Sequence, residues 1–208
     1  MVKTPGLVLA SMALVAVIGL VAMLLRESGV RHPGVPDLRT GVALAAPVVL
    51  PDFSLSDQRG GPFTAASLRG HWSLVVPGFT YCPDICPTTL ATLHRVHTQL
   101  AADASPLQVV LLTVDPERDS TEVLARYLAF FNPAFIGVTG APAQLEQLYQ
   151  VLGVQRIRIP GAQGAYSVDH SAALLLVDPG GRLAGYFMPP FSAERLTADL
   201  GPLLAAGQ

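Results

Sequence analysis

The sequence predicts an α/β domain whose mixed sheet has helices on both faces, preceded by one N-terminal transmembrane helix. Short apolar stretches that suit buried strands alternate with stretches of helical periodicity, which is typical of α/β proteins. Two apolar stretches near the C-terminus flank a turn sequence and predict an antiparallel pair, so the sheet is mixed. A long apolar run at the N-terminus predicts the transmembrane helix.

The apolar run covers residues 7–25 and is long enough for a bilayer core, which needs roughly 17–25 apolar residues. A cleaved signal peptide is the alternative, because Lys3 precedes the run. Such peptides have an apolar region of only about 7–15 residues, and the nearest Ala-x-Ala site follows far downstream at residues 43–45. Basic residues on both sides of the run leave its orientation open. We therefore expect residues 1–27 to form a membrane anchor.

The rest of the chain divides into a tether and one domain. Residues 28–47 are interrupted by glycine and proline without a sustained period, which predicts a flexible tether. Residues 48–208 have the length of a single domain. Because the formal net charge is −2 and no cluster of Lys and Arg occurs, nucleic acid is not expected as a partner.

The expected elements of the domain begin with a short hairpin, predicted by residues 53–55 and a turn at 59–62. Residues 71–79 suit a buried strand, and residues 87–102 a helix with Pro87 at its first position. The alternation then continues with a strand at 107–114, a helix at 120–130 capped by Ser120, a strand at 135–138 and a helix at 141–152 closed by Gly153.

The C-terminal part is predicted to be a hairpin and a helix. Strands at 172–177 and 183–188 flank Asp178–Gly181, where Pro179 and Gly180 match the central pair of a type II turn. A final helix is expected at 192–204.

The chain has only two cysteines, Cys82 and Cys86, and both lie at a predicted junction of strand and helix. In a helix-like turn four residues rise about 6 Å and bring both sulfurs to one face, where they can share a metal. The spacing also suits a disulfide, and a helix N-terminus favours the thiolate, the form that binds metals and attacks disulfides. A structural disulfide is the other alternative, although so short a loop would constrain little entropy.

His170 is the candidate for a third ligand among the five histidines. His94 lies about 12 Å along the predicted helix from Cys86, which is too far. The others are assigned to the same helix, to the start of a strand and to the tether: His97, His71 and His32. A strand, a cysteine pair opening a helix and a late hairpin form the thioredoxin-like order, in which the segment before the hairpin packs against the cysteines. That order places the His170 imidazole facing the two sulfurs.

Three stretches carry a specific resemblance: residues 78–87 (GFTYCPDICP), 113–119 (TVDPERD) and 166–171 (YSVDHS). In this order they are similar to the Sco (SenC) family of copper-binding proteins. The resemblance implies a membrane anchor, a thioredoxin-like fold and copper held by Cys82, Cys86 and His170. It also implies a partner, the binuclear copper site of cytochrome c oxidase subunit II.

One departure from the family's pattern is Val76-Pro77, where a proline removes a ladder donor and is expected to end the strand early. The peroxiredoxins share the broad fold, but their Pro-x-x-x-Thr-x-x-Cys signature is absent. Here Thr80 stands two residues before Cys82, not three.

The expected donor set is soft and three-coordinate, which suits Cu(I) and leaves an open side, whereas structural zinc takes a fourth protein ligand. With Cu(II), water or a carboxylate could complete the site. Four carboxylates are candidates for such an outer role, although for Asp84 and Asp119 capping and turn formation are the simpler interpretation: Asp84, Asp115, Asp119 and Asp169.

These observations support a copper metallochaperone that serves subunit II and exchanges metal with other copper carriers, with no small-molecule substrate. The alternative is a thiol-disulfide oxidoreductase that reduces the cysteines of the same partner site. A copper or redox sensor ranks last, because no output domain is present. The N-terminus lacks the Arg- and Ser-rich pattern of mitochondrial import, so we expect a bacterial inner membrane with the domain on its periplasmic side.

Overall fold

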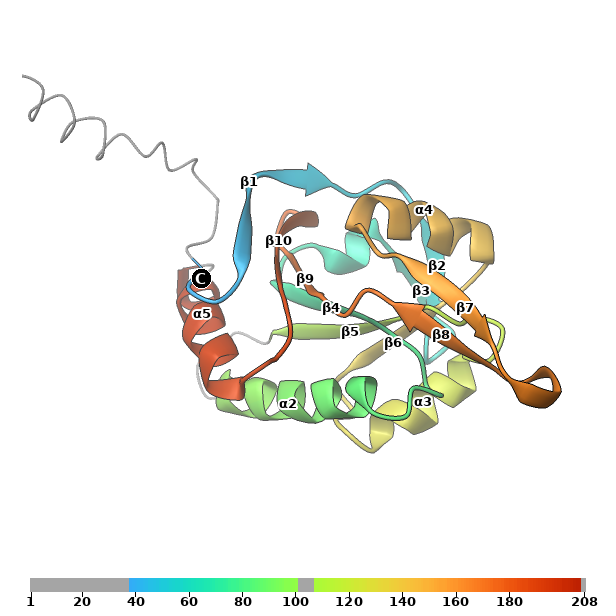
Figure 1. Ribbon diagram of the computed structural model, residues 1–208. Coiled ribbons are helices and arrows are strands. Elements are labelled where there is room, and N and C mark those ends of the chain that lie inside the picture. The colour runs from blue at the N-terminus through green and yellow to red at the C-terminus, as the bar shows by residue number, and fades with distance from the viewer. Residues whose placement is uncertain (1–37, 101–106, 207–208) are drawn as a thin grey trace, which may run out of the picture. The chain divides into compact units, whose positions relative to one another are not determined.

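The computed structural model describes residues 38–100 and 107–206 (Figure 1). The expected anchor, residues 1–27, and His32 lie outside this part of the chain. Among the helices of the described residues, none has the length and apolar character needed to cross a bilayer.

An eight-stranded mixed sheet forms the centre of the domain, in the strand order β1-β10-β9-β4-β5-β6-β2-β3. The neighbours β4, β5 and β6 are parallel, and the other pairs are antiparallel. The strands are β1 (Val42–Val49), β2 (Ser54–Asp57), β3 (Pro62–Thr64), β4 (Ser73–Gly78), β5 (Gln108–Thr113), β6 (Ile136–Thr139), β9 (Leu174–Val177) and β10 (Arg182–Phe187).

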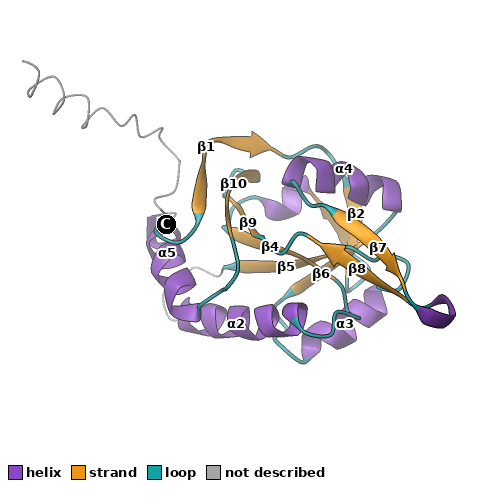
Figure 2. Cartoon of the chain, in the orientation of Figure 1, coloured by secondary structure: helices purple, strands orange, loops and turns teal. Residues whose placement is uncertain are grey.

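Helices cover both faces of this sheet (Figures 1 and 2). They are α2 (Ile85–Leu100), α3 (Thr121–Ala129), α4 (Pro142–Leu152) and α5 (Ala193–Ala206), with short 3-10 turns η1 (Ala65–Leu68) and η3 (Ala162–Gly164). Helix α4 shares one core cluster with the sheet, while α2, α3 and α5 share the other. Successive residues of β5 alternate between the two clusters, as the period of a strand requires. The predicted α/β architecture is therefore confirmed.

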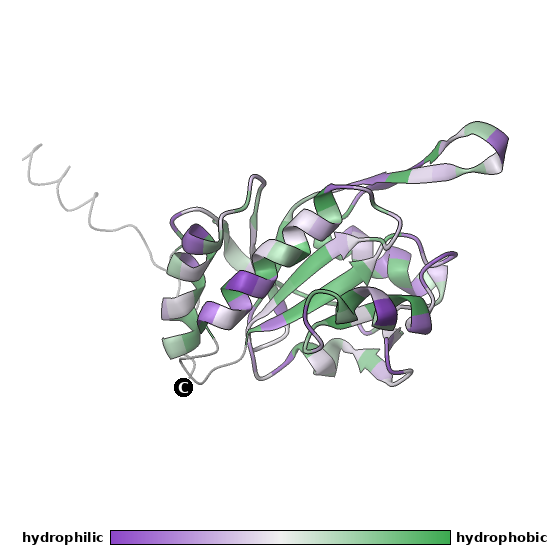
Figure 3. Ribbon diagram, turned by 90° about the horizontal axis from the view of Figure 1, so that it is seen from below, coloured by the Kyte–Doolittle hydropathy of each residue, from purple (hydrophilic) through white to green (hydrophobic). Residues whose placement is uncertain are grey.

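A separate two-stranded sheet, the β7–β8 hairpin, joins β7 (Arg156–Pro160) to β8 (Tyr166–His170). The hairpin projects from the body of the domain, with η3 at its tip (Figures 1 and 3). Every residue of β7 is exposed, whereas Val168 of β8 is buried in the core cluster on the α4 side of the sheet. The sequence did not predict these strands, because they show no buried apolar run.

Strand β1 corrects the predicted boundary between tether and domain. Residues 28–47 were expected to be a tether, but Val42–Val49 pairs antiparallel with β10. The pairing has an irregularity between Ala43 and Val48, and Pro47 lies in this stretch. A proline and an interrupted register hide the period of a strand, and this explains the error.

The expectation that the strand ends early at Pro77 is wrong, because β4 continues to Gly78. Pro77 and Gly78 both remain paired with β5, while β9 pairs only with residues 73–75 of β4. Beyond Val75 the strand has a partner on one side only, which is the edge-like position where proline is tolerated.

The predicted type II turn at Asp178–Gly181 is also wrong. The Gly181 N–H donates to the carbonyl of Asp178 over 2.8 Å, so Pro179 and Gly180 are the central pair. A type II turn needs positive φ at Gly180, but the positive φ, 75°, belongs to Gly181. This is the pattern of a type I turn followed by a left-handed glycine, which is common in hairpins.

The Asp199 carboxylate fixes the start of the described chain to α5. It accepts hydrogen bonds from the backbone N–H groups of Arg39 and Thr40, both 2.8 Å, and from the Thr40 hydroxyl, 2.6 Å. Burial opposes ionisation of this group, but the hydrogen bonds from Thr40, Arg39 and Gly41 outweigh it and hold the pKa of Asp199 below its ordinary value.

We expect Asp199→Ala to lower the free energy of unfolding by about 2 kcal/mol at neutral pH, because three donors of Arg39 and Thr40 lose their charged acceptor. A depressed pKa adds stability above the unfolded-state value, and this stability is lost as pH falls through the folded-state value. The difference between wild type and variant should therefore shrink in acid, as measured by urea unfolding at pH 7 and near pH 3. An equal loss at both pH values would contradict the assignment.

Candidate metal centre

The two cysteines lie where β4 leads into α2. The Cys82 N–H donates to the carbonyl of Phe79 over 3.2 Å, and the Cys86 N–H donates to the Cys82 sulfur over 3.4 Å. Helix α2 begins at Ile85, so Pro87 is not its first residue as predicted, and Cys86 lies in the first turn. Both cysteines are free thiols, Cys82 half-buried and Cys86 buried.

Gly78 makes room for the Cys86 sulfur. A Cβ atom at this position would lie 3.1 Å from Cys86 Sγ and 2.9 Å from a methyl group of Leu111. The absence of a side chain therefore lets the end of β4 approach the cysteine closely.

His170, the last residue of β8, brings its ring to Cys86. Its Nε2 lies 3.8 Å from Cys86 Sγ, and its Nδ1 lies 2.9 Å from the carbonyl oxygen of Ser171. A carbonyl accepts only from an N–H, so Nδ1 carries the proton and Nε2 presents its lone pair towards the sulfur. The ring also packs edge-on against Phe79, with centroids 5.8 Å apart.

Cys82 and His170 line one cavity of about 100 Å³, at the point where the hairpin meets the cysteine loop. Thus the structure brings together all three residues that the sequence selected as ligands. In the two described stretches, however, no set of three or more His, Cys, Asp and Glu residues is already arranged around a metal position.

The separation of Cys86 and His170 suits two ligands of one ion. With the bond lengths of zinc, a first-row ion of similar size, about 2.3 Å to sulfur and about 2.0 Å to nitrogen, a trigonal angle puts the two donor atoms about 3.7 Å apart. The observed distance is 3.8 Å. Two sulfurs and one imidazole nitrogen form a soft set, which fits copper better than a hard ion such as Mg²⁺.

The Cys86 thiol does not have the thiolate character expected at a helix N-terminus. Burial raises its pKa to about 12, and the neighbouring Cys82 adds to this, although a backbone contact with Phe79 acts in the opposite direction. The favourable field of α2 is therefore outweighed by burial, which sequence position alone does not reveal. A metal that binds Cys86 must displace its proton.

We expect the reduced, metal-free protein to be alkylated at Cys82 well before Cys86, because Cys86 is only 2% exposed. Brief treatment with iodoacetamide at pH 8 and peptide mass spectrometry would measure both sites. Guanidinium-unfolded protein is the control, in which both should react. Equal labelling of the native protein would contradict the buried position of Cys86.

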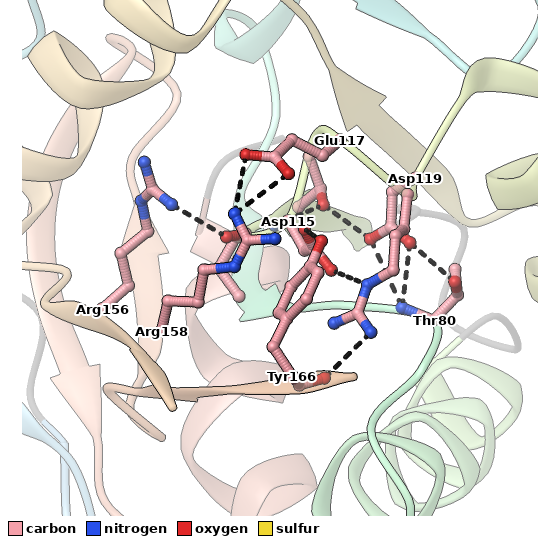
Figure 4. A network of polar contacts seen from close by, with 10 residues as sticks. Thr80, Asp115, Glu117, Asp119, Arg156, Arg158 and Tyr166 are labelled. Atoms are coloured by element: carbon pink, nitrogen blue, oxygen red, sulfur yellow. Dashed lines mark hydrogen bonds and ion pairs between the residues drawn. The ribbon is translucent and has the colours of Figure 1, made fainter. Parts of the chain in front are cut away.

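The segment after β5 holds the cysteine loop through Asp119. Its buried carboxylate accepts hydrogen bonds from the hydroxyls of Thr80 and Thr113, both 2.6 Å, and from the Thr80 N–H at 3.2 Å (Figure 4). The simpler interpretation of Asp119 as a helix cap is wrong, because the Ser120 hydroxyl accepts from Val123 N–H at the start of α3. Sequence reasoning missed this contact between distant segments.

The other candidate carboxylates differ in burial. Asp115 is buried, accepts from the Tyr166 hydroxyl over 2.9 Å and pairs with Arg118 (Figure 4). Asp84 and Asp169 are exposed.

The other histidines of the described residues, which were assigned to the helix and to the start of a strand, lie outside the site. His97 Nδ1 lies 3.3 Å from the side-chain amide of Asn132, and His71 Nε2 lies 3.2 Å from the carbonyl of Ser67. His94 is exposed on α2.

Comparisons with known proteins agree with the sequence resemblance. The sequence model of the SCO1/SenC family matches residues 43–205. A "putative copper-binding protein" of Stutzerimonas stutzeri is 41% identical over 156 residues, which cover 74% of this chain and 76% of that protein. The human mitochondrial SCO2 homolog is 40% identical over 171 residues, 81% of this chain and 64% of that protein. The chain thus spans less than two thirds of the length of this mitochondrial relative.

Solved structures share the architecture. Copper-bound ScoI of Bradyrhizobium japonicum has a TM-score of 0.69 and 34% identity, over 74% of this chain and 99% of that chain. Apo Sco1 of Thermus thermophilus has a TM-score of 0.71 and 35% identity, over 82% and 99%. These similarities confirm the thioredoxin-like mixed α/β fold of the domain.

Proposed function

The chain belongs to the SCO1/SenC family, and from this premise we propose that it is a copper metallochaperone for the binuclear copper site of cytochrome c oxidase subunit II. The observation that carries the proposal is the approach of His170 Nε2 to Cys86 Sγ, at 3.8 Å, beside a cavity that Cys82 also lines. The copper bound in solved relatives supports the choice of metal.

Copper is the cargo in this proposal, and the three ligands have different tasks. Cys86 is the inner ligand, where burial excludes competing water, and the half-buried His170 lies beside it. The half-buried Cys82 is the outer ligand, so an acceptor thiolate reaches the ion from its side and replaces the protein's ligands one at a time. Subunit II is the proposed acceptor, and other copper carriers are the proposed donors.

The position in the cell is part of the same proposal. We infer that residues 7–25 anchor the chain in a bacterial inner membrane, with the domain on the periplasmic side. There the domain would face an acceptor site on the same side of the membrane.

A transfer experiment tests the proposal directly. The reduced full chain in detergent is loaded with one equivalent of Cu(I) and mixed with the reduced copper domain of subunit II. We expect copper to move to the acceptor, as followed by metal analysis after separation and by the appearance of the binuclear site's absorption. The Cys82→Ser/Cys86→Ser variant is the control and should carry no copper. Wild-type protein that binds no copper would refute the proposal.

A second candidate is reduction of the acceptor's cysteines, favoured by one half-buried and one buried free thiol within the same turn. The Cys82 thiolate would attack a disulfide of the partner and release one thiolate, and Cys86 would then displace the partner from the mixed disulfide. The products are two partner thiols and a Cys82–Cys86 disulfide, so the pair supplies two electrons and an external thiol reductant restores it. This reaction does not require His170, which separates it from copper delivery.

A further inference from the structure

The candidate ligands lie on two segments, the cysteine loop and the β7–β8 hairpin. Four side chains form a stack between these segments: Tyr81, Arg118, Tyr166 and Arg158. The Arg118 guanidinium carbon lies 4.7 Å from the ring centre of Tyr81 and 3.7 Å from that of Tyr166. The Arg158 guanidinium carbon lies 3.5 Å from the same Tyr166 ring. Two guanidinium groups so close to one ring centre cannot share a face, so they enclose the Tyr166 ring. We call this set the arginine–tyrosine stack.

The stack joins the segments that carry the ligands. Tyr81 directly precedes Cys82, and Tyr166 is the first residue of β8, whose last residue is His170. Arg118 belongs to neither segment, since it follows β5 in the body of the domain. Its guanidinium therefore contacts the cysteine loop on one side and the histidine-bearing hairpin on the other.

Polar contacts fix Arg118 in this position. Its Nε pairs with the buried Asp115 carboxylate, and its Nη1 donates to the backbone carbonyl of Tyr166 over 3.0 Å. The Tyr166 hydroxyl donates to the same Asp115 carboxylate, as Figure 4 shows. The Nη2 of Arg118 is buried without a hydrogen-bond partner, which is tolerable where aromatic faces stabilise the cation. Asp115, in the body of the domain, thus fixes the Arg118 side chain, and Arg118 in turn binds the hairpin at Tyr166.

Besides Arg118, other contacts join hairpin and body, among them the edge-on packing of His170 on Phe79 and a loose pair of Arg156 and Glu146 at 3.8 Å. Val168, opposite Arg158 in the middle of the hairpin, packs into the core cluster on the α4 side. Arg158 pairs with Glu117 over 3.1 Å, but both side chains are more than half exposed, so water and salt weaken the pair. Arg156 Nη1 reaches the carbonyl of Val114 only at 3.4 Å.

We propose that Arg118 is a positioning residue that holds the β7–β8 hairpin against the cysteine loop and thereby keeps His170 beside Cys86. The part of this proposal that concerns copper binding rests on the proposed function. The coupling of hairpin and cysteine loop does not, because it can be measured without metal. Arg118 acts on the metal only through His170. Its replacement should therefore impair Cu(II) binding, which depends on the imidazole, more than Cu(I) binding by the two sulfurs.

Arg118→Lys is the informative variant, because lysine keeps the charge next to Asp115 but lacks the planar group that stacks on two rings and reaches the Tyr166 carbonyl. We expect its affinity for Cu(II) to fall about 10- to 100-fold in competition titrations of the full chain. Added to His170→Ala, the same change should have no further effect. Arg126→Lys, at an exposed position of α3, is the matched control and should bind as wild type does.

A metal-free measurement tests the coupling independently. Hydrogen exchange of the apo protein should be faster at the β7–β8 amides in Arg118→Lys, with α2 unchanged, because only the hairpin is released. Tyr81, which is 63% exposed, offers a second pair of variants that leave the fold intact. Tyr81→Leu should weaken Cu(II) binding, and Tyr81→Phe, which keeps the ring, should not.

The outcomes distinguish the two proposals. Wild-type exchange and wild-type Cu(II) affinity in Arg118→Lys would overturn the positioning role, as would an equal loss of affinity when His170 is already alanine. If the wild-type protein binds no copper, the proposed function fails, and the exchange experiment still decides whether Arg118 couples hairpin and loop.

Discussion

Replacing His170 by alanine is expected to abolish tight Cu(II) binding while the cysteine pair remains able to form and break a disulfide. The ring places Nε2 3.8 Å from Cys86 Sγ, and its Nδ1 is already fixed by the Ser171 carbonyl. Losing an outer-shell partner of a metal ligand typically costs 10- to 100-fold in affinity, so the loss of the ligand should exceed about 100-fold. Competition titrations with Cu(II) chelators measure the affinity, and thiol titration against glutathione measures the disulfide.

Two controls make this result specific. His94→Ala removes an exposed histidine of α2, and Asp52→Ala removes an exposed carboxylate just before β2, so both should bind copper as wild type does. If the His170→Ala protein kept one tightly bound Cu(II), the ligand assignment would be wrong. If its disulfide chemistry were lost as well, the ring would have a role in thiol exchange that the proposal does not give it.

Asp119→Ala is expected to have a large effect on stability, lowering the free energy of unfolding by about 3 kcal/mol. The variant leaves the hydroxyls of Thr80 and Thr113 and the Thr80 N–H without their acceptor, within a buried site. Urea unfolding of the metal-free protein measures the loss. Asp52→Ala, at an exposed position, is the matched control and should stay within about 0.5 kcal/mol of wild type.

The effect of Asp119 should depend on pH in the direction opposite to that of Asp199. Burial raises the pKa of Asp119, although hydrogen bonds from Thr113 and Thr80 partly offset this. A raised pKa gives stability that is fully present below the unfolded-state value, about 3.9, and is lost as pH rises through the folded-state value. The difference between wild type and Asp119→Ala should therefore be larger in acid than at pH 8, and a constant difference would contradict the raised pKa.

The parts of the fold predicted from sequence are those whose residues are buried on a regular period. Strands β4 and β5, for example, are continuous apolar runs, and α3 begins where its capping Ser120 indicates. The β7–β8 hairpin could not be predicted in this way, since β7 is exposed along its whole length. Pairing with β8 and the burial of Val168 stabilise it, and neither leaves a periodic signal in the sequence.

The candidate site, too, was predicted from the sequence only in part. The proximity of His170 to the cysteines followed from the order of elements, because that order fixes which segment crosses the end of β4. The order of elements did not predict that burial raises the pKa of Cys86, nor that the Asp119 carboxylate binds the cysteine loop at Thr80. Burial of one thiol depends on what packs around it, and Asp119 meets Thr80 across 39 residues of sequence.

The hairpin's separate pairing has a practical consequence for experiments in solution. Because β7 and β8 bond to each other and not to the eight-stranded sheet, the tip at Ala162–Gly164 belongs to neither core cluster. A cysteine-free reporter, such as a fluorescent unnatural amino acid at the exposed Ala162, should be accepted there without loss of stability. Its distance to a second dye on α4 would then report, one molecule at a time, whether the arm that carries His170 is docked.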